Sequence, residues 1–140
     1  MWELLVVLLV RRVSPPGALP LDLDDTLFHK TGRKVAGAGI FRDAVRSLAR
    51  SVVYALGLNL VVLTLRIRPP WGGEPLGLPI NVRLYRKGGP SHLDLGEAML
   101  RELAGWLPSR TFALGCDGAY ASLAGRGLPR TQVTSRIRKD

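Results

Sequence analysis

The stretch LDLDDTLF, Leu21–Phe28, carries three aspartates and is compatible with two unrelated chemistries. Its first residues alternate between apolar and polar side chains, which predicts a short strand. The strand should begin at or after Leu21, because Pro20 cannot donate to a strand ladder. In one chemistry, Asp22 is a nucleophile that attacks phosphorus and Asp24 is its acid/base partner. In the other, Asp24 binds a metal ion together with a second carboxylate far along the chain.

The chain beyond this octapeptide predicts a mixture of strands and helices. Residues 58–67 are apolar and β-branched and predict a strand, and residues 80–87 alternate, with Ile80, Val82 and Leu84 on one face. We expect these two strands to pair antiparallel across the Pro/Gly-rich loop between them. The other expected elements are an amphipathic or buried helix in 1–13, a loop or short hairpin in 26–40, strands near 111–117 and 131–137, and a short helix or turn in 118–125.

The clearest helix signal lies in residues 91–108. Ser91 and Asp94 form a candidate capping box, and Pro108 ends the helical pattern. The expected apolar stripe comprises Leu95, Met99, Leu103 and Trp106. A helix of this length can cross over from the strand pair to the next strand. The fold class that follows is α/β with a mixed sheet.

Composition and charge narrow the choice of partner. The chain has 140 residues, the size of one ordinary domain, and a hydrophobic fraction of 46%. Its formal net charge of +9 favours a polyanion such as nucleic acid, unless arginine-rich codon usage alone inflates the charge. One cysteine, Cys116, excludes an intrachain disulfide and fits a reducing compartment. The N-terminal apolar run is too short to span a bilayer, so we expect no membrane partner.

The octapeptide is similar to the first motif of the haloacid dehalogenase-like hydrolases, Asp-x-Asp-x-Thr after an apolar strand. That resemblance implies a phosphatase that uses Asp22 and Asp24. The chemistry also needs a lysine at the aspartyl-phosphate and a later acidic pair that holds Mg²⁺. Asp117 could belong to such a pair, but residues 118–139 contain no Asp or Glu. The phosphatase is therefore the less favoured interpretation.

Three longer blocks together resemble a DDE-class insertion-sequence transposase. They are residues 24–47, 59–91 and 116–129, and they stand in the right order. The resemblance implies a ribonuclease H-like mixed sheet with crossover helices and Mg²⁺-dependent cleavage and joining of DNA ends. It also implies that Asp24 and Asp117 are the first two catalytic acids and metal ligands. These residues would lie at the ends of neighbouring strands and share a site for two Mg²⁺ ions.

Other charged residues take their expected roles from that site. Asp25 points to the opposite side of its strand, whereas Asp22 shares the face of Asp24 and is either a supplementary ligand or a destabilising substitution. Basic residues near the acids are expected to bind the DNA backbone without sequence preference. These residues are Lys30, Arg33, Lys34, Arg136, Arg138 and Lys139.

The resemblance also implies that part of the family's catalytic core is missing. A third acid, a glutamate on a helix after Asp117, has no counterpart before Asp140. We therefore expect a remnant N-terminal helix and linker in 1–18, and in 19–140 a partial catalytic domain that is incomplete at the C-terminus. Such a fragment would be an inactive transposase by ancestry or a non-catalytic DNA-binding remnant. We expect it in the bacterial cytoplasm, associated with the nucleoid; a homo-oligomer is expected of the complete family enzyme.

Overall fold

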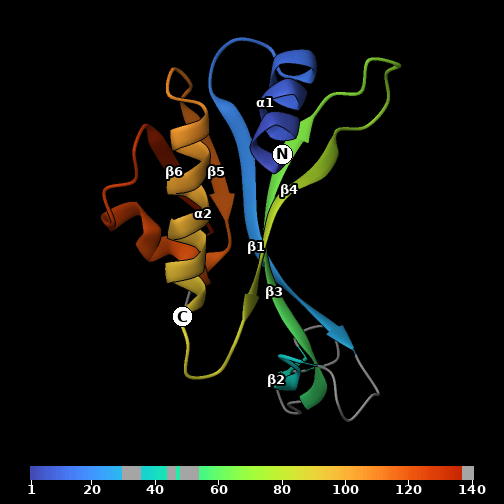
Figure 1. Cartoon of the computed structure of the whole chain (residues 1–140), viewed down its shortest axis with the longest axis vertical. Coiled ribbons are helices and arrows are strands. Elements are labelled where there is room, and N and C mark those ends of the chain that lie inside the picture. Colours follow the sequence, from blue (N-terminus) through green and yellow to red (C-terminus); the bar gives the residue numbers. More distant parts are fainter. Residues whose placement is uncertain (30–35, 44–46, 48–53, 137–140) are drawn as a thin grey trace.

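A curled, mixed six-stranded sheet forms one layer of the protein, and the helices form the other (Figure 1). The computed structural model describes residues 1–29, 36–43, 47 and 54–136. The expected mixed α/β class is confirmed. The elements are α1 (Trp2–Val13), β1 (Leu19–His29), β2 (Gly39–Arg42), β3 (Tyr54–Ile67), β4 (Leu76–Tyr85), α2 (His92–Trp106), β5 (Phe112–Cys116), the 3₁₀ helix η1 (Gly118–Gly125) and β6 (Thr131–Ser135).

The strands follow the order β2-β3-β1-β5-β6. β2 pairs with the beginning of β3, and β4 pairs with the rest of β3. β3 is antiparallel to β1, β2 and β4, whereas β5 is parallel to both β1 and β6. The antiparallel pairing predicted for β3 and β4 is therefore confirmed. In Figure 1 the long β1–β3 ribbon extends away from α2, β5 and β6 toward β2.

Alternation along the strands gives the sheet one deeply buried face. Leu21 and Leu23 of β1 pair with Leu65 and Leu63 of β3, and all four side chains are buried. α1 and α2 contribute to the same core cluster through Val6, Val10, Met99, Leu100, Leu103 and Ala104. Burying one leucine or valine stabilises a fold by about 1.5 to 3 kcal/mol, so this core holds helices and sheet together. Among the described residues, no helix has the length and hydropathy needed to cross a membrane.

The start of β1 differs from the prediction. The strand begins at Leu19, whose N–H donates to the Thr111 carbonyl over 2.9 Å, and it includes Pro20. Successive residues of a strand direct their backbone groups to opposite sides, so the Pro20 nitrogen faces β3 rather than β5. Pairing with β3 begins only at Leu21, and the missing N–H of Pro20 therefore leaves no ladder position unfilled. β1 also continues to His29, through residues that were expected to form a loop.

A bulge in β4 changes the expected alternation. Leu63 and Thr64 of β3 lie opposite residues 79–81 of β4, so Ile80 is an extra residue without a partner in the β3–β4 ladder. Ile80 is buried in the core, whereas Val82 is 46% exposed. The prediction that these two side chains share a face is wrong, because the extra residue shifts the alternation.

α2 begins as its sequence predicts. Ser91 is the N-cap residue: its side chain accepts from the Asp94 N–H, and the Asp94 carboxylate accepts from the Ser91 N–H. The predicted capping box is thus confirmed. The buried stripe is broader than expected, because Leu100 and Ala104 join Met99 in the core. Leu103 is also buried, and Leu95 and Trp106 are only partly buried.

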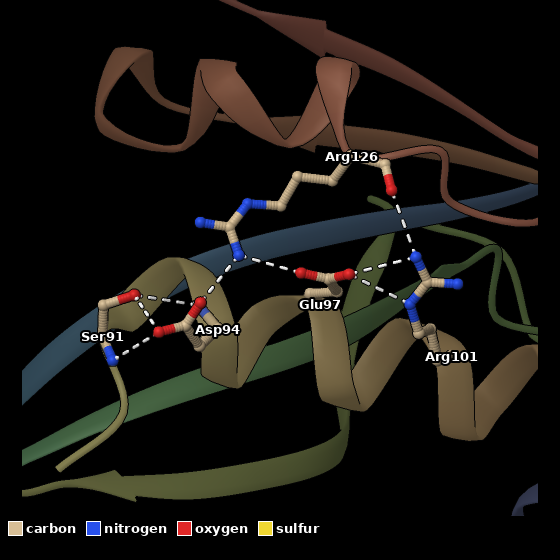
Figure 2. A network of polar contacts seen from close by, with 5 residues as sticks. All are labelled: Ser91, Asp94, Glu97, Arg101 and Arg126. Carbon is tan, nitrogen blue, oxygen red and sulfur yellow. Dashed lines mark hydrogen bonds and ion pairs between the residues drawn. The ribbon is translucent and has the colours of Figure 1, made fainter.

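A polar network joins α2 to the residue that follows η1 (Figure 2). Arg126 Nη1 donates to Asp94 Oδ1 and to Glu97 Oε2, each over 2.8 Å. Arg101 donates to Glu97 Oε1 over 3.0 Å and to the Arg126 carbonyl over 3.1 Å. Asp94 also accepts from Ser91, so the network connects the N-cap of α2 with the end of η1.

This network should make the protein sensitive to acid between about pH 4 and pH 2. Arg126, and after it Ser91, lower the pKa of Asp94 from 3.8 to about 2, and Arg126 also lowers the pKa of Glu97. Depressed carboxyl pKa values stabilise the fold fully above the ordinary values, and this stabilisation is lost as the pH falls through the lowered ones. Urea denaturation at stepped pH should show Arg126→Gln flattening this part of the stability curve, and Arg12→Gln leaving it unchanged.

Candidate functional site

Asp24 and Asp117 occupy equivalent positions, each directly after the last residue pair of two neighbouring parallel strands. The last pair in the β1–β5 ladder is Leu23 with Cys116, and each aspartate is the next residue along the chain. The predicted adjacency and parallel direction of the two strands are confirmed. Asp24 was expected to end β1, but β1 runs on to His29 beside β3. Asp24 is the first residue after the part of β1 that pairs with β5.

Each of the two carboxylates is oriented by a neighbouring backbone N–H. Asp24 Oδ1 accepts from the Asp25 N–H over 2.8 Å. Asp117 is the N-cap of η1, and its Oδ1 accepts from the Ala119 N–H over 2.8 Å. Among the described residues, the Oδ2 atoms of both acids accept no hydrogen bond, and both residues are exposed. Each acid therefore presents one oxygen to a ligand.

The surroundings of Asp24 favour a bound cation. Partial burial raises the pKa of Asp24, and the negative charges of Asp25 and Asp117 raise it further, against the lowering effect of the Asp25 backbone hydrogen bond. These influences penalise the ionised carboxylate when no cation is near. A divalent cation would offset them, because it brings opposite charge to the same position.

The two acids line an open hollow of about 580 Å³. Register places Asp22, Gly115 and Thr134 side by side on β1, β5 and β6. Gly115 leaves space for the Asp22 carboxylate, since a Cβ at this position would lie 2.9 Å from Asp22 Oδ1. The lining residues are Asp22, Leu23, Asp24, Gly115, Cys116, Asp117, Thr134, Ser135 and Arg136.

Asp22 is engaged by an arginine of the neighbouring strand. Arg66 of β3 donates through Nη2 to Asp22 Oδ1 over 2.7 Å and to Oδ2 over 2.8 Å, and through Nε to Oδ2 over 3.2 Å. Both oxygens of this carboxylate are therefore held by one guanidinium. A carboxylate in such a fork is oriented and charge-compensated, unlike those of Asp24 and Asp117.

Of the basic residues predicted to bind DNA, Arg136 is the one that the described ranges contain. It follows β6 directly, is exposed and lines the hollow beside the two acids. A guanidinium that lines the hollow can contact a phosphate while the acids hold a cation. Lys30, Arg33, Lys34, Arg138 and Lys139 lie outside the described residues, and their role stays a prediction.

Two residues near the site had no assigned role in the sequence analysis. Tyr120 donates through its hydroxyl to Asp25 Oδ1 over 3.0 Å, and Arg66 holds Asp22. The position of Tyr120, three residues after Asp117, is a signal that could have indicated a structural partner of the second acid. Arg66 carries no local signal, because its contact depends on the register between β1 and β3.

Asp24 and Asp117 form a pair rather than a larger cluster. Within the part of the chain that the structure describes, no group of three or more His, Cys, Asp or Glu side chains is placed to hold a metal ion. Neither the protein-family models, nor the curated proteins, nor the solved structures compared with this chain match it.

Proposed function

We propose that Asp24 and Asp117 bind Mg²⁺ in a protein that acts on DNA. We further propose that the chain derives from the DDE-class insertion-sequence transposases. The observation that carries the proposal is the register that sets the two acids side by side, one residue past the β1–β5 ladder. Enzymes that cleave phosphodiesters with metal ions gather carboxylates from distant parts of the chain in this way. Neighbouring strands lie about 4.8 Å apart, a separation at which two carboxylates can share one cation.

The sheet supports a ribonuclease H-like fold for the same chain. Three antiparallel strands, β4, β3 and β1, are followed across the sheet by two strands parallel to β1, and α2 makes the crossover. This arrangement agrees with the fold that the resemblance implies. It also puts both acids at the carboxyl end of the parallel pairing.

The donor set suits a hard divalent cation. Both candidate ligands are carboxylate oxygens, which Mg²⁺ prefers, and each retains one oxygen without a hydrogen bond in the described structure. Bound Mg²⁺ would supply activation of water or a 3′-hydroxyl and stabilisation of the leaving oxygen. The chain itself would orient the acids through the Asp25 and Ala119 N–H groups and offer Arg136 to a DNA phosphate. We propose Mg²⁺ binding by these two acids and DNA binding by the chain that carries them.

The phosphatase interpretation is less well supported by the contacts of Asp22. A nucleophilic aspartate needs an oxygen that is free to attack phosphorus. Arg66 occupies both Asp22 oxygens, whereas the free oxygens belong to Asp24 and Asp117. The hollow therefore fits a metal site built on Asp24 and Asp117 better than a covalent site built on Asp22.

Binding of Mn²⁺ as a paramagnetic substitute for Mg²⁺ tests the proposal. In a ¹⁵N-labelled chain, substoichiometric Mn²⁺ should broaden the amide resonances of residues 22–25, 115–118 and 134–136 before any others, because broadening falls steeply with distance from the ion. Excess Mg²⁺ should restore those resonances by competition.

Three results would count against the proposal. Broadening centred elsewhere in the chain would remove Asp24 and Asp117 as the metal ligands. Mg²⁺-dependent hydrolysis of a phosphate monoester, lost in Asp22→Asn, would make the chain a phosphatase with a covalent intermediate on Asp22. DNA binding without localised Mn²⁺ broadening would instead favour the non-catalytic DNA-binding protein.

A further inference from the structure

Three hydrogen bonds link the two acids through Asp25 and Tyr120. Asp24 Oδ1 accepts from the Asp25 N–H over 2.8 Å, and Asp25 Oδ1 accepts from the Tyr120 hydroxyl over 3.0 Å. The Tyr120 N–H donates to the Asp117 carbonyl over 3.1 Å. The path thus runs from the first acid through Asp25 and Tyr120 to the second, across 95 positions of sequence between Asp25 and Tyr120.

The central member of the path is rigidly placed. Tyr120 is 1% exposed and belongs to the hydrophobic core. Its hydroxyl donates to the Asp25 carboxylate, which can only accept when it is ionised. A buried phenol with one fixed acceptor restrains the distance between its ring and that acceptor.

The segment that carries Tyr120 is also fixed at its other end. η1 begins at the Asp117 cap and ends at Arg126, which is joined to Asp94 and Glu97 of α2 (Figure 2). Tyr120 fastens the beginning of the same segment to β1. Asp117 therefore stands on a short helix that is attached to the sheet on one side and to α2 on the other.

We infer that Asp25 and Tyr120 are positioning residues that set the geometry of the Asp24–Asp117 pair for a divalent cation. The inference rests on the proposed metal-binding function. Neither residue needs to contact the metal ion: Asp25 directs its N–H to the Asp24 carboxylate, and Tyr120 holds the turn that presents Asp117. Partners that orient metal ligands in this way typically change metal affinity by about 10- to 100-fold when they are removed.

Four single variants of the full chain test the inference through Mn²⁺ affinity, measured by titration calorimetry. Tyr120→Phe removes only the hydroxyl and should weaken Mn²⁺ binding by about 10-fold. Tyr85→Phe removes a hydroxyl from a half-buried tyrosine that stacks on His92, and it should leave the affinity within about 2-fold, as expected of a site outside the path. Asp25→Asn and Asp25→Ala remove the same charge, but only asparagine keeps an acceptor for Tyr120. Asp25→Asn should therefore bind Mn²⁺ several-fold more tightly than Asp25→Ala.

The outcomes separate this inference from the function on which it rests. Equal Mn²⁺ affinities for Tyr120→Phe and Tyr85→Phe, or for the two Asp25 variants, would overturn the positioning role while leaving the metal site in place. A parent chain that binds no Mn²⁺ would overturn the proposed function. Amide hydrogen exchange at Asp25 and Ala119 then decides: faster exchange in Tyr120→Phe than in Tyr85→Phe supports the restraint on the acids, and equal rates contradict it. If Tyr120→Phe fails to fold, the Asp25 pair carries the test.

Discussion

Replacing Asp24 and Asp117 together with asparagine should lower Mn²⁺ affinity by more than about 100-fold, since even indirect partners of metal ligands change affinity by about 10- to 100-fold. Both acids line the hollow and keep one oxygen without a hydrogen bond in the described structure, and amide oxygens carry no charge to attract the ion. Titration calorimetry on the parent and the double variant measures the change. Glu74→Gln, in the exposed loop before β4, is the control for loss of an unrelated acid and should bind as the parent does.

Asp24→Asn by itself should stabilise the metal-free chain at neutral pH. Burial and the neighbouring carboxylates raise the pKa of Asp24 above 3.8, so the ionised form is less favourable in the folded than in the unfolded chain. The parent therefore loses stability as the pH rises through the ordinary pKa toward the raised one, and the asparagine variant does not. Below about pH 3.8 the two should have the same free energy of unfolding. A variant with lower stability at pH 7 and unchanged Mn²⁺ affinity would show that Asp24 is structural.

Local signals in the sequence were sufficient for several elements and for one strand pairing. The capping box at Ser91 depends on residues three apart, and the helix begins where those residues indicate. The β3–β4 hairpin follows from two apolar strands on either side of a Pro/Gly loop. The length of α2 predicts a crossover between β4 and the next strand, but the pairing of that strand with β1, which brings Asp24 beside Asp117, was expected only from the family resemblance.

Features that depend on the partner strand could not be predicted locally. β3 is 14 residues long, and its length allows β1 to continue past Asp24 in a ribbon that no local turn signal contradicts. The bulge at Ile80 likewise reflects the fit of β4 to β3, since the sequence of β4 alternates without interruption. The contact between Asp22 and Arg66 spans 44 positions and exists only in the observed register.

Asp25 shows the same limit at the candidate site. Its sequence position predicts correctly that it faces away from Asp24, because successive strand residues alternate. On that side its carboxylate accepts a hydrogen bond from Tyr120, which follows α2 and β5 in the sequence. An acid that looks surplus in the sequence therefore has a defined partner in the fold.

The proposed DNA binding should depend steeply on salt, because a protein of net charge +9 would bind phosphates mainly by releasing counterions. If about six to ten phosphates are contacted, affinity for a duplex of arbitrary sequence should fall by about 10³- to 10⁵-fold between roughly 50 and 200 mM salt. Fluorescence anisotropy with two unrelated duplexes measures the slope and should give the same value for both. An affinity that stays constant over this range would rule out the electrostatic account, and no binding at low salt would leave codon usage as the origin of the charge.

Arg136→Gln should reduce the slope of log affinity against log salt by about 0.9, the contribution of one phosphate contact to B-DNA. Arg136 lines the hollow next to Asp24 and Asp117, where a phosphodiester must approach if the acids act on DNA. The matched control is Arg12→Gln, an equal loss of charge in the last turn of α1, which precedes β1 at the opposite end of the β1–β5 ladder. Steering by overall charge alone would make the two variants equivalent. A larger loss for Arg136→Gln than for Arg12→Gln, increasing when Mg²⁺ is present, is the result expected if the phosphate lies between the arginine and the two acids.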